Sequence, residues 1–190
     1  MTRFILIRHG ETDWNAEGRY QGQSDVPLND RGRRQSAELA AELRENQPSA
    51  IYCSDLKRAS ESAEILGRAL GLRVYQDPRL REIHLGSWEG MLFEEIQAIY
   101  SELLKLRKLD PRTVSAPGGE TVEQVRTRVM AAVREIAERH TNETIAIVSH
   151  GLALAILIAR YQGRPIEEVW DLIPQNGELV YISGWNYESD

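Results

Sequence analysis

The sequence has few of the features that mark disulfide-bonded, metal-binding or membrane-spanning proteins. Its single cysteine, Cys53, excludes an internal disulfide, and with no second cysteine nearby there is no cysteine-based zinc motif. We expect Cys53 to be a small buried residue. The longest apolar run, Leu152 to Ala159, is too short to cross a bilayer, and the opening MTRFILIRHGE contains no signal-peptide hydrophobic region. These features predict a cytoplasmic protein that does not associate with membranes.

Positive charge is also in short supply. The 190 residues include 23 lysines and arginines against 29 aspartates and glutamates, which gives a formal net charge of −6. This balance excludes a general polyanion-binding surface and hence argues against nucleic acid as a partner, so any anionic ligand must meet a local cluster of cations. With 42% hydrophobic and 27% charged residues, the composition is otherwise that of a globular protein. The length fits one domain over residues 1–190.

Short apolar segments alternate with amphipathic ones along the whole chain. The apolar, β-branched segments predict strands at 3–7, 51–53, 73–75, 144–148 and 179–182, the last at a sheet edge. Helical spacing predicts helices over 28–44, 56–70, 93–109 and 152–161, and Thr121 with Gln124 forms a capping box before a further helix. Alternation of strands and helices predicts an α/β protein with a mostly parallel sheet.

Two of the predicted strands end in a His-Gly pair. FILI leads into RHG at residues 8–10, and IAIV leads into SHG at residues 149–151. Open α/β sheets place their ligands beyond the carboxyl ends of strands, so His9 and His150 are expected to share one crevice. Arg8 at a buried strand end needs an anion, and a phosphate would satisfy it. A single histidine at a strand end is more often structural, so the inference depends on the pair.

The motifs around these histidines resemble those of the histidine phosphatase superfamily, the phosphoglycerate-mutase-like proteins. RHGETDWN matches the family's N-terminal signature, and six further blocks follow in order over most of the chain: GRYQG, LNDRGRRQS, YCSDLKRASESA, LREIHLGSWEG, PGGETVEQV and VSHG. The resemblance implies a three-layer α/β/α sandwich with a mostly parallel central sheet. It also implies chemistry without a metal or a cofactor, and the four histidines include no His-x-x-x-His pair that would suggest a metal site.

The resemblance assigns catalytic roles to individual residues. His9 matches the nucleophile, which attacks phosphorus to form a phosphohistidine that water then hydrolyses. Glu82 matches the general acid, which protonates the leaving oxygen and then activates water. Arg8, Arg58 and His150 match the pocket that neutralises the phosphoryl oxygens. Taken alone, Glu82 and Arg58 would be interpreted as ordinary surface charges, and the surrounding motifs favour the functional interpretation.

The substrate-binding set that the resemblance implies adds groups beside these catalytic residues. They are Gly10, Asn15, Gln21, Gly22, His84 and Gly151. Asn15 and Gln21 could instead cap or bridge a polar turn, and His84 could be a structural or solvent-facing histidine. His140 is expected near a helix C-terminus and needs no catalytic role. The Asn176-Gly177 pair is interpreted as a turn before the last strand rather than as part of the site.

The same catalytic motifs serve phosphatases, which give the phosphoryl group to water, and mutases, which return it to a bound product. The stretch between Glu82 and His150 is short, which leaves little room for a long inserted lid. We therefore predict a histidine acid phosphatase-type hydrolase of small phosphorylated metabolites. The alternatives are a phosphoglycerate mutase and a phosphate-binding module without turnover. The family's phosphatases include enzymes for sugar phosphates, phosphoserine and α-ribazole phosphate, and the motifs do not choose among them.

Two further expectations concern surfaces. Residues 90–119 contain an apolar helical face and are expected to cover the pocket. Leu154–Ile158 and the terminal Trp185 and Tyr187 are candidates for a homodimer surface, although burial within the monomer explains the first of these equally well. The expected partner is a small-molecule phosphate ester, and homodimerisation is left open.

Overall fold

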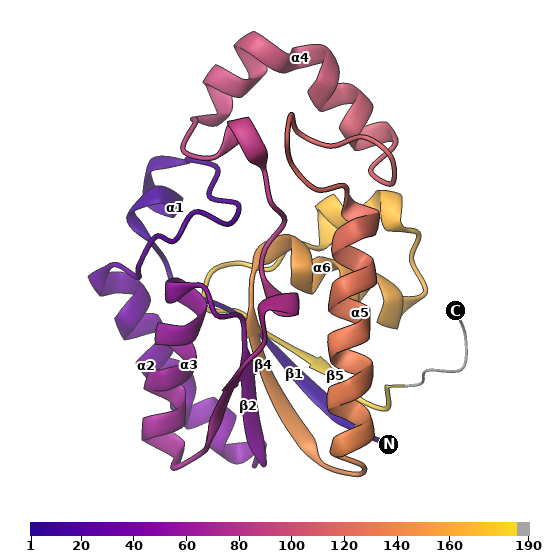
Figure 1. Ribbon diagram of the computed structural model, residues 1–190. Coiled ribbons are helices and arrows are strands. Elements are labelled where there is room, and N and C mark those ends of the chain that lie inside the picture. The colour runs from indigo at the N-terminus through magenta and orange to yellow at the C-terminus, as the bar shows by residue number, and fades with distance from the viewer. Residues whose placement is uncertain (186–190) are drawn as a thin grey trace.

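A computed structural model describes residues 1–185 (Figure 1), and its centre is a five-stranded sheet in the order β3-β2-β4-β1-β5. The strands are β1 (Arg3–Arg8), β2 (Ala50–Cys53), β3 (Val74–Gln76), β4 (Thr144–Ser149) and β5 (Leu179–Ile182). The pairings of β1 with β4, β4 with β2 and β2 with β3 are parallel, whereas β5 runs antiparallel to β1 at the edge. The predicted strands and the mostly parallel sheet are confirmed.

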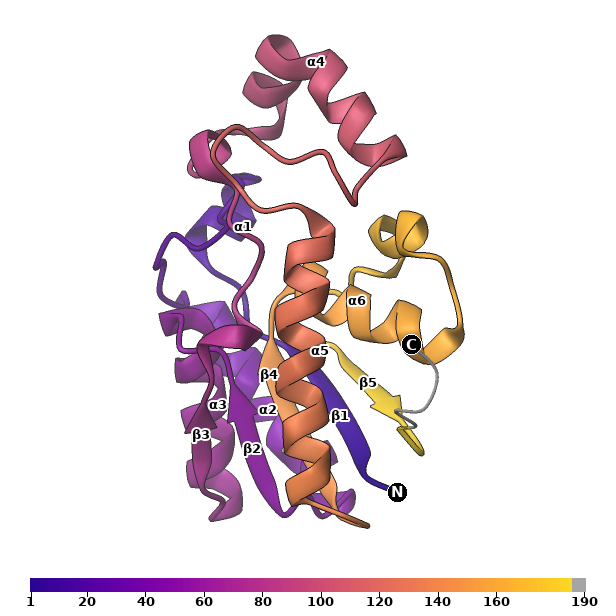
Figure 2. The same ribbon diagram turned by 45° about the vertical axis from the view of Figure 1, so that its right-hand side comes forward.

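Helices cover both faces of the sheet, which confirms the three-layer arrangement (Figures 1 and 2). The helices α2 (Asp30–Glu45) and α3 (Lys57–Leu70) pack on one face, and α5 (Val122–Arg139) and α6 (Gly151–Gln162) pack on the other. The longest helix outside these layers, α4 (Phe93–Leu109), lies beyond the carboxyl ends of the parallel strands. This end of the sheet is therefore the one that α4 can cover.

The central strand β1 is buried on both faces, as its unbroken apolar sequence predicts. Phe4 and Leu6 pack into the layer of α5 and α6, whereas Ile5 and Ile7 pack into the layer of α2 and α3. Cys53 lies in the second of these layers and is fully buried, as predicted. Burial raises the pKa of its thiol to about 12, so the group stays protonated and unreactive.

Local capping signals set several helix ends. The Asn29 side chain accepts a hydrogen bond from Gly32 N at the start of α2, and Thr121 with Gln124 forms the predicted capping box of α5. His140 follows the last turn of α5, where its Nε2 lies 3.0 Å from the Tyr52 hydroxyl. This is the structural position that we expected for His140.

Four short elements were not predicted because one or two turns carry too little periodicity to stand out in a sequence. They are α1 (Asp13–Glu17) and the 3₁₀ helices η1 (Pro78–Leu80), η2 (Gly86–Trp88) and η3 (Ile166–Leu172). The long helix α4 has the predicted limits but is interrupted at Tyr100, whose φ of −124° and ψ of 29° are not helical. The ring of Tyr100 packs against Trp88 of η2 with centroids 5.8 Å apart.

The proposed dimer surfaces are used inside the chain instead. Every residue of Leu154–Ile158 is buried, and Trp185 is only 5% exposed because its ring packs edge-on against Phe4. The prediction that Trp185 contributes to an exposed surface is therefore wrong, because its ring is buried against Phe4 in the core. Tyr187 lies outside the described residues. Within residues 1–185, no helix combines the length and apolar character needed to cross a membrane.

Candidate functional site

The strand register brings the two His-Gly pairs together. β1 and β4 are parallel neighbours in which Arg8 is paired with Ser149, so the next residue of each strand is a histidine at the same edge. The rings of His9 and His150 have centroids 5.1 Å apart, and His9 N donates a hydrogen bond to Ser149 O at 3.0 Å. Backbone pairing thus brings the two histidines side by side, as expected.

The His9 ring is held in one tautomer and is uncharged. Its Nδ1 lies 2.7 Å from Gly10 O, which accepts the Nδ1 proton and leaves a lone pair on Nε2. Burial and the charges of Arg58 and Arg8 lower the pKa of His9 well below its ordinary value, and the bond to Gly10 only partly opposes them. The ring is 3% exposed. His9 is therefore a neutral base with a free nitrogen at neutral pH.

Two arginines flank the histidines, Arg58 buried and Arg8 half-buried. Arg58 is 1% exposed, and its Nη1 and Nη2 donate to Ser24 O at 2.8 Å and Gly22 O at 2.7 Å. Arg8 Nη1 donates to Pro174 O at 2.6 Å. Burial lowers the pKa of Arg58 to about 10, which still leaves a cation at neutral pH. Gly22 thus belongs to the site through its carbonyl, which orients one of these guanidinium groups.

Several donors of this cluster are buried without a partner among residues 1–185. They are Arg8 Nε, Arg58 Nε and one ring nitrogen of His150, whose other ring nitrogen is an equally unpaired acceptor when the ring is neutral. Burial, followed by the charges of Arg58 and His9, also lowers the pKa of His150 well below its ordinary value. Unpaired buried polar groups are costly, and a few guanidinium N–H groups around one point are suited to an anion with several oxygens. The arrangement can therefore hold a phosphate group.

The carboxyl group of Glu82 contacts the first turn of α6, the helix that begins directly after His150. It accepts hydrogen bonds of 3.0 to 3.3 Å from three backbone amides, those of Ile83, Leu152 and Ala153. A Cβ added at Gly151 would lie 3.5 Å from Arg8 Cζ and 3.6 Å from Glu82 Oε2, so the acid and the arginine meet at this glycine. A half-buried, oriented carboxyl group therefore stands beside the histidine and arginine cluster.

The amides of Asn15 and Gln21 are oriented by a residue that the sequence analysis missed. The Thr12 hydroxyl is buried and lies 3.0 Å from both Asn15 Oδ1 and Gln21 Oε1. With their oxygens engaged, the two amide nitrogens form no hydrogen bond within residues 1–185 and are available to an acceptor. The Thr12-x-x-Asn15 capping box of α1 is the sequence signal that could have identified Thr12.

Two other assignments change. The His84 ring is 45% exposed and its Nδ1 lies 3.1 Å from Gly118 O, so the structure does not bring this ring to the His9 cluster. Asn176, interpreted as a turn residue, does follow that interpretation but also donates from Nδ2 to His9 O at 3.1 Å and to Asn15 Oδ1 at 3.3 Å. The Asn-Gly pair therefore marks a turn and also supplies a side chain that holds the loop after β1.

Close backbone packing explains Gly10. A Cβ at this position would lie 2.3 Å from Gly32 O, so only glycine lets the loop after β1 pass the first turn of α2. Gly10 N also donates to the Ser62 hydroxyl at 3.1 Å. Ser62 lies on α3, one turn after Arg58, and was not identified from the sequence. It holds the loop that carries His9.

A cleft of about 560 Å³ opens from this cluster toward α4. Arg8, Glu82 and Gly151 line it at the strand ends, and Phe93, Leu104 and Arg107 are among the residues that α4 contributes. The helix that the sequence analysis expected over the pocket therefore forms one of its walls. The cleft offers room for an organic group next to the phosphate-sized cluster.

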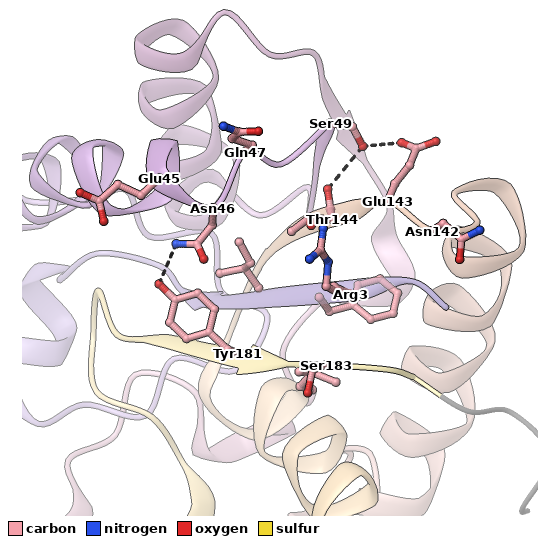
Figure 3. Close-up of a pocket in the computed structure, with 13 residues that line it drawn as sticks. Arg3, Glu45, Asn46, Gln47, Ser49, Asn142, Glu143, Thr144, Tyr181 and Ser183 are labelled. Atoms are coloured by element: carbon pink, nitrogen blue, oxygen red, sulfur yellow. Dashed lines mark hydrogen bonds between the residues drawn. The ribbon is translucent and has the colours of Figure 1, made fainter.

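A second hollow, of about 640 Å³, lies at the opposite end of β1 and β4 (Figure 3). Asn46 Nδ2 donates to the Tyr181 hydroxyl, and the Ser49 hydroxyl bonds to Glu143 and to Thr144 O. None of the predicted site residues lines this hollow. The candidate chemistry is therefore confined to the cleft beneath α4.

Comparisons with known proteins agree with the geometry. The profile of the histidine phosphatase superfamily (branch 1) matches residues 4–189. Phosphoserine phosphatase 1 of Hydrogenobacter thermophilus is 36% identical over 182 residues, which cover 96% of this chain and 86% of that protein. Phosphoglycerate mutase-like protein 4 of Arabidopsis thaliana is 39% identical over 170 residues, which cover 87% of this chain and 74% of that protein.

Solved structures extend the similarity to three dimensions. The mycobacterial glucosyl-3-phosphoglycerate phosphatase in complex with VO3 has a TM-score of 0.88 at 33% identity, over 96% of this chain and 91% of that one. The α-ribazole phosphatase of Shigella flexneri has a TM-score of 0.83 at 31% identity, over 94% and 89% of the two chains. With its matching profile, its relatives and its paired histidines, this chain belongs to the histidine phosphatase superfamily, branch 1.

Proposed function

We propose that the protein is a phosphatase of small phosphomonoesters that works through a phosphohistidine on His9. The observation that carries this proposal is the set of buried, unpaired donors on Arg8, Arg58 and His150 around a neutral His9. A phosphoryl group can accept hydrogen bonds from all of them and balance both guanidinium charges. The family and the names of its phosphatase members support the same reaction class.

In the first step, the His9 Nε2 lone pair attacks phosphorus. A phosphorus–nitrogen bond forms while the bond to the leaving oxygen breaks, and that oxygen takes a proton from the Glu82 carboxyl group. Arg8 and Arg58 stabilise the charge on the three remaining phosphoryl oxygens. The Gly10 carbonyl holds the Nδ1 proton throughout and stabilises the charged ring of the phosphohistidine.

In the second step, water releases the phosphate. The Glu82 carboxylate accepts a proton from a water molecule while the oxygen of that water attacks phosphorus. The phosphorus–nitrogen bond breaks, and its electron pair returns to His9. Both neutral His9 and protonated Glu82 are then restored. A mutase is the second candidate because relatives include mutase-like proteins, and it would pass the phosphoryl group to a bound hydroxyl instead.

The test is p-nitrophenyl phosphate hydrolysis in EDTA between pH 5 and 8. The wild-type protein should turn over the ester, and His9→Ala should lose at least about three orders of magnitude in kcat/KM because it removes the nucleophile. His84→Ala is the matched control, since its exposed ring lies outside the cluster, and should retain turnover close to wild type. An alkali-stable phosphorylated intermediate should be trapped in the wild type and be absent from His9→Ala.

Three results would contradict the proposal. Hydrolysis that persists in His9→Ala would exclude His9 as the nucleophile. Absence of hydrolysis of any ester by the wild type, with transfer of a phosphoryl group between hydroxyls of phosphoglycerate, would identify a mutase. Absence of both reactions would identify a binding module.

A further inference from the structure

One buried guanidinium in the cleft has no part in the chemistry above. Arg107, in the second half of α4, is only 6% exposed. Within residues 1–185 it forms no hydrogen bond or ion pair, and its Nε is a buried nitrogen with no acceptor. Its Cζ lies 4.6 Å from the ring centroid of Trp170 and 5.7 Å from that of Trp88. Two indole rings, rather than a carboxylate, therefore surround this cation.

A guanidinium in such surroundings is incompletely satisfied. Cation–π attraction offsets only part of the cost of removing a charge from water, and the five N–H donors of Arg107 need acceptors. Burial lowers its pKa, and the only acidic groups whose charge opposes this shift are Tyr20 and Glu82, neither of which it contacts by a hydrogen bond. An arginine nevertheless remains protonated near pH 7. The positive charge is therefore present without a resident counter-ion.

A second donor stands beside Arg107. The Trp170 Nε1 is also buried with no acceptor among the described residues, and the ring that carries it lines the same cleft. The walls between Arg107 and the His9 cluster are largely apolar and include Phe93, Leu104 and Ile173. Arg107 and Trp170 come from α4 and η3, so the two donors meet only in the folded protein. The cleft is thus lined by Arg8 at the strand ends and by Lys105, Arg107 and Lys108 of α4, and its walls are otherwise largely apolar.

We propose that Arg107 is a second anion-binding site, which selects phosphate esters whose leaving alcohol carries a carboxylate or a second phosphate. This inference rests on the proposed function, because the first anion is the phosphoryl group that His9 accepts. The fork of a guanidinium matches the paired oxygens of either anion. In a chain with a net charge of −6, an anionic ligand must meet local cations, and Arg107 is a cation that lines the cleft.

The test uses esters that differ only at the far end. Straight-chain ω-carboxyalkyl phosphates are compared with alkyl phosphates and ω-carbamoylalkyl phosphates of the same length, over several chain lengths. We expect one length at which kcat/KM for the carboxyl ester exceeds that of both uncharged esters by about 10- to 100-fold, as for a charge-assisted hydrogen bond. Bisphosphates of the matching diols show whether phosphate serves better than carboxylate.

Variants assign this preference to Arg107. Arg107→Met should reduce the carboxyl-to-carbamoyl ratio to within about threefold of unity, and Arg107→Lys should restore part of it as a point charge. Arg34→Met is the matched control, because it removes an arginine charge from an exposed position of α2 that does not line the cleft, and it should retain the ratio. A ratio near unity in the wild type would overturn the inference. So would equal losses for charged and uncharged esters in Arg107→Met, or an equal loss of the ratio in Arg34→Met.

A binding measurement separates this inference from the proposed function. Calorimetry with His9→Ala measures the dissociation constants of the same esters without turnover, and the double variant with Arg107→Met should lose the preference for the carboxyl ester. p-Nitrophenyl phosphate, which lacks a second anion, tests the phosphatase activity alone. Hydrolysis of this ester without any preference for anionic leaving groups would overturn the second site and leave the proposed function intact. Tighter binding of the carboxyl ester, without hydrolysis of any ester, would support the second site and overturn the proposed function.

Discussion

Arg58 illustrates how a single residue of this site can destabilise the folded protein until a ligand binds. Two of its nitrogens are committed to Ser24 O and Gly22 O, which fixes the direction of the guanidinium. Its Nε has no acceptor among the described residues, and Arg8 adds a second positive charge nearby. Phosphate binding should therefore stabilise the folded protein, because the anion supplies the missing acceptors and the opposite charge.

We predict that Arg58→Met removes most of this ligand-dependent stabilisation. In wild type, inorganic phosphate at 100 times its dissociation constant should raise the free energy of unfolding by about 2.7 kcal/mol. Arg58→Met should reduce the gain at the same phosphate concentration to below about 1 kcal/mol, since it deletes a charged donor. Urea denaturation with and without phosphate measures both values. Arg68, an exposed arginine of the same helix, is the control, and Arg68→Met should keep the full gain. A phosphate-dependent gain in the free energy of unfolding that is undiminished in Arg58→Met would contradict the role of Arg58 in phosphate binding.

The role of Glu82 predicts a dependence on the leaving group. Glu82→Gln cannot donate a carboxyl proton, so kcat/KM for an alkyl phosphate should fall by about 10²- to 10⁴-fold. The loss with p-nitrophenyl phosphate should be much smaller, because its leaving oxygen needs little protonation. Steady-state kinetics with both esters checks the difference. Equal losses for the two esters would mean that Glu82 contributes to binding or folding rather than to proton donation.

At the scale of elements, the segment that carries Glu82 has no regular secondary structure and is held from outside. Arg128 of α5 donates to two carbonyls of this segment and to one of η1 before it: Arg81 O at 2.5 Å, Glu82 O at 2.9 Å and Arg79 O at 2.9 Å. The same guanidinium is paired with Glu120 at 2.8 Å. A rigid helix therefore positions the proposed acid through one side chain.

Replacing Arg128 should consequently affect the proton-transfer step more than phosphate binding. Arg128→Leu removes a donor from three carbonyls and the ion-pair partner of Glu120, which should cost about 2 to 4 kcal/mol of stability. Among correctly folded molecules, kcat/KM for alkyl phosphates should fall at least about tenfold more than for p-nitrophenyl phosphate, because Glu82 is displaced. Arg128→Lys should recover part of the loss. Arg139, exposed at the end of α5, is the control, and Arg139→Leu should lower neither the stability nor kcat/KM substantially. A uniform loss of kcat/KM for both esters in Arg128→Leu would exclude a positioning role.

At the scale of the whole molecule, the sheet collects its functional groups at one edge because β1 and β4 are parallel neighbours. The parallel register places His9 beside His150, and burial of both rings lowers the pKa of each well below its ordinary value. The folded protein therefore binds fewer protons than the unfolded chain once the pH falls below about 6.5, the ordinary histidine value. Stability must then decrease as the pH falls through this range, and it is fully present above it.

We predict a fall in the free energy of unfolding of up to about 2.7 kcal/mol per pH unit below pH 6.5, the limit for two neutral histidines. Urea denaturation in phosphate-free buffer at pH 7.5, 6.5 and 5.5 measures this slope. His9→Gln should lower the slope by up to half, since one titrating group is removed. A free energy of unfolding that does not change between pH 7.5 and 5.5 would show that the two rings are not buried in their neutral form.

Local patterns were sufficient for most of the architecture. Unbroken apolar runs identified the buried strands, and Thr121 with Gln124 marked the start of α5 because a capping box depends on neighbouring residues alone. The pairing of His9 with His150 was predicted for a similar reason, since the carboxyl ends of parallel strands share an edge. The bracing roles of Thr12 and Ser62 were missed because their partners lie in other segments of the chain.

The sequence by itself therefore determined the α/β class, the sheet edge that carries the site, and the histidines, arginines and glutamate gathered there, because strand burial and motif order are local. Only the tertiary structure decided what surrounds them. Arg107 lies in LKLRKLD, which has the composition of an exposed helix, and its burial results from packing against Trp88 and Trp170 of separate elements. Long-range contacts set burial and partners, and these decide whether a charge is a solvated surface group or a site for a ligand.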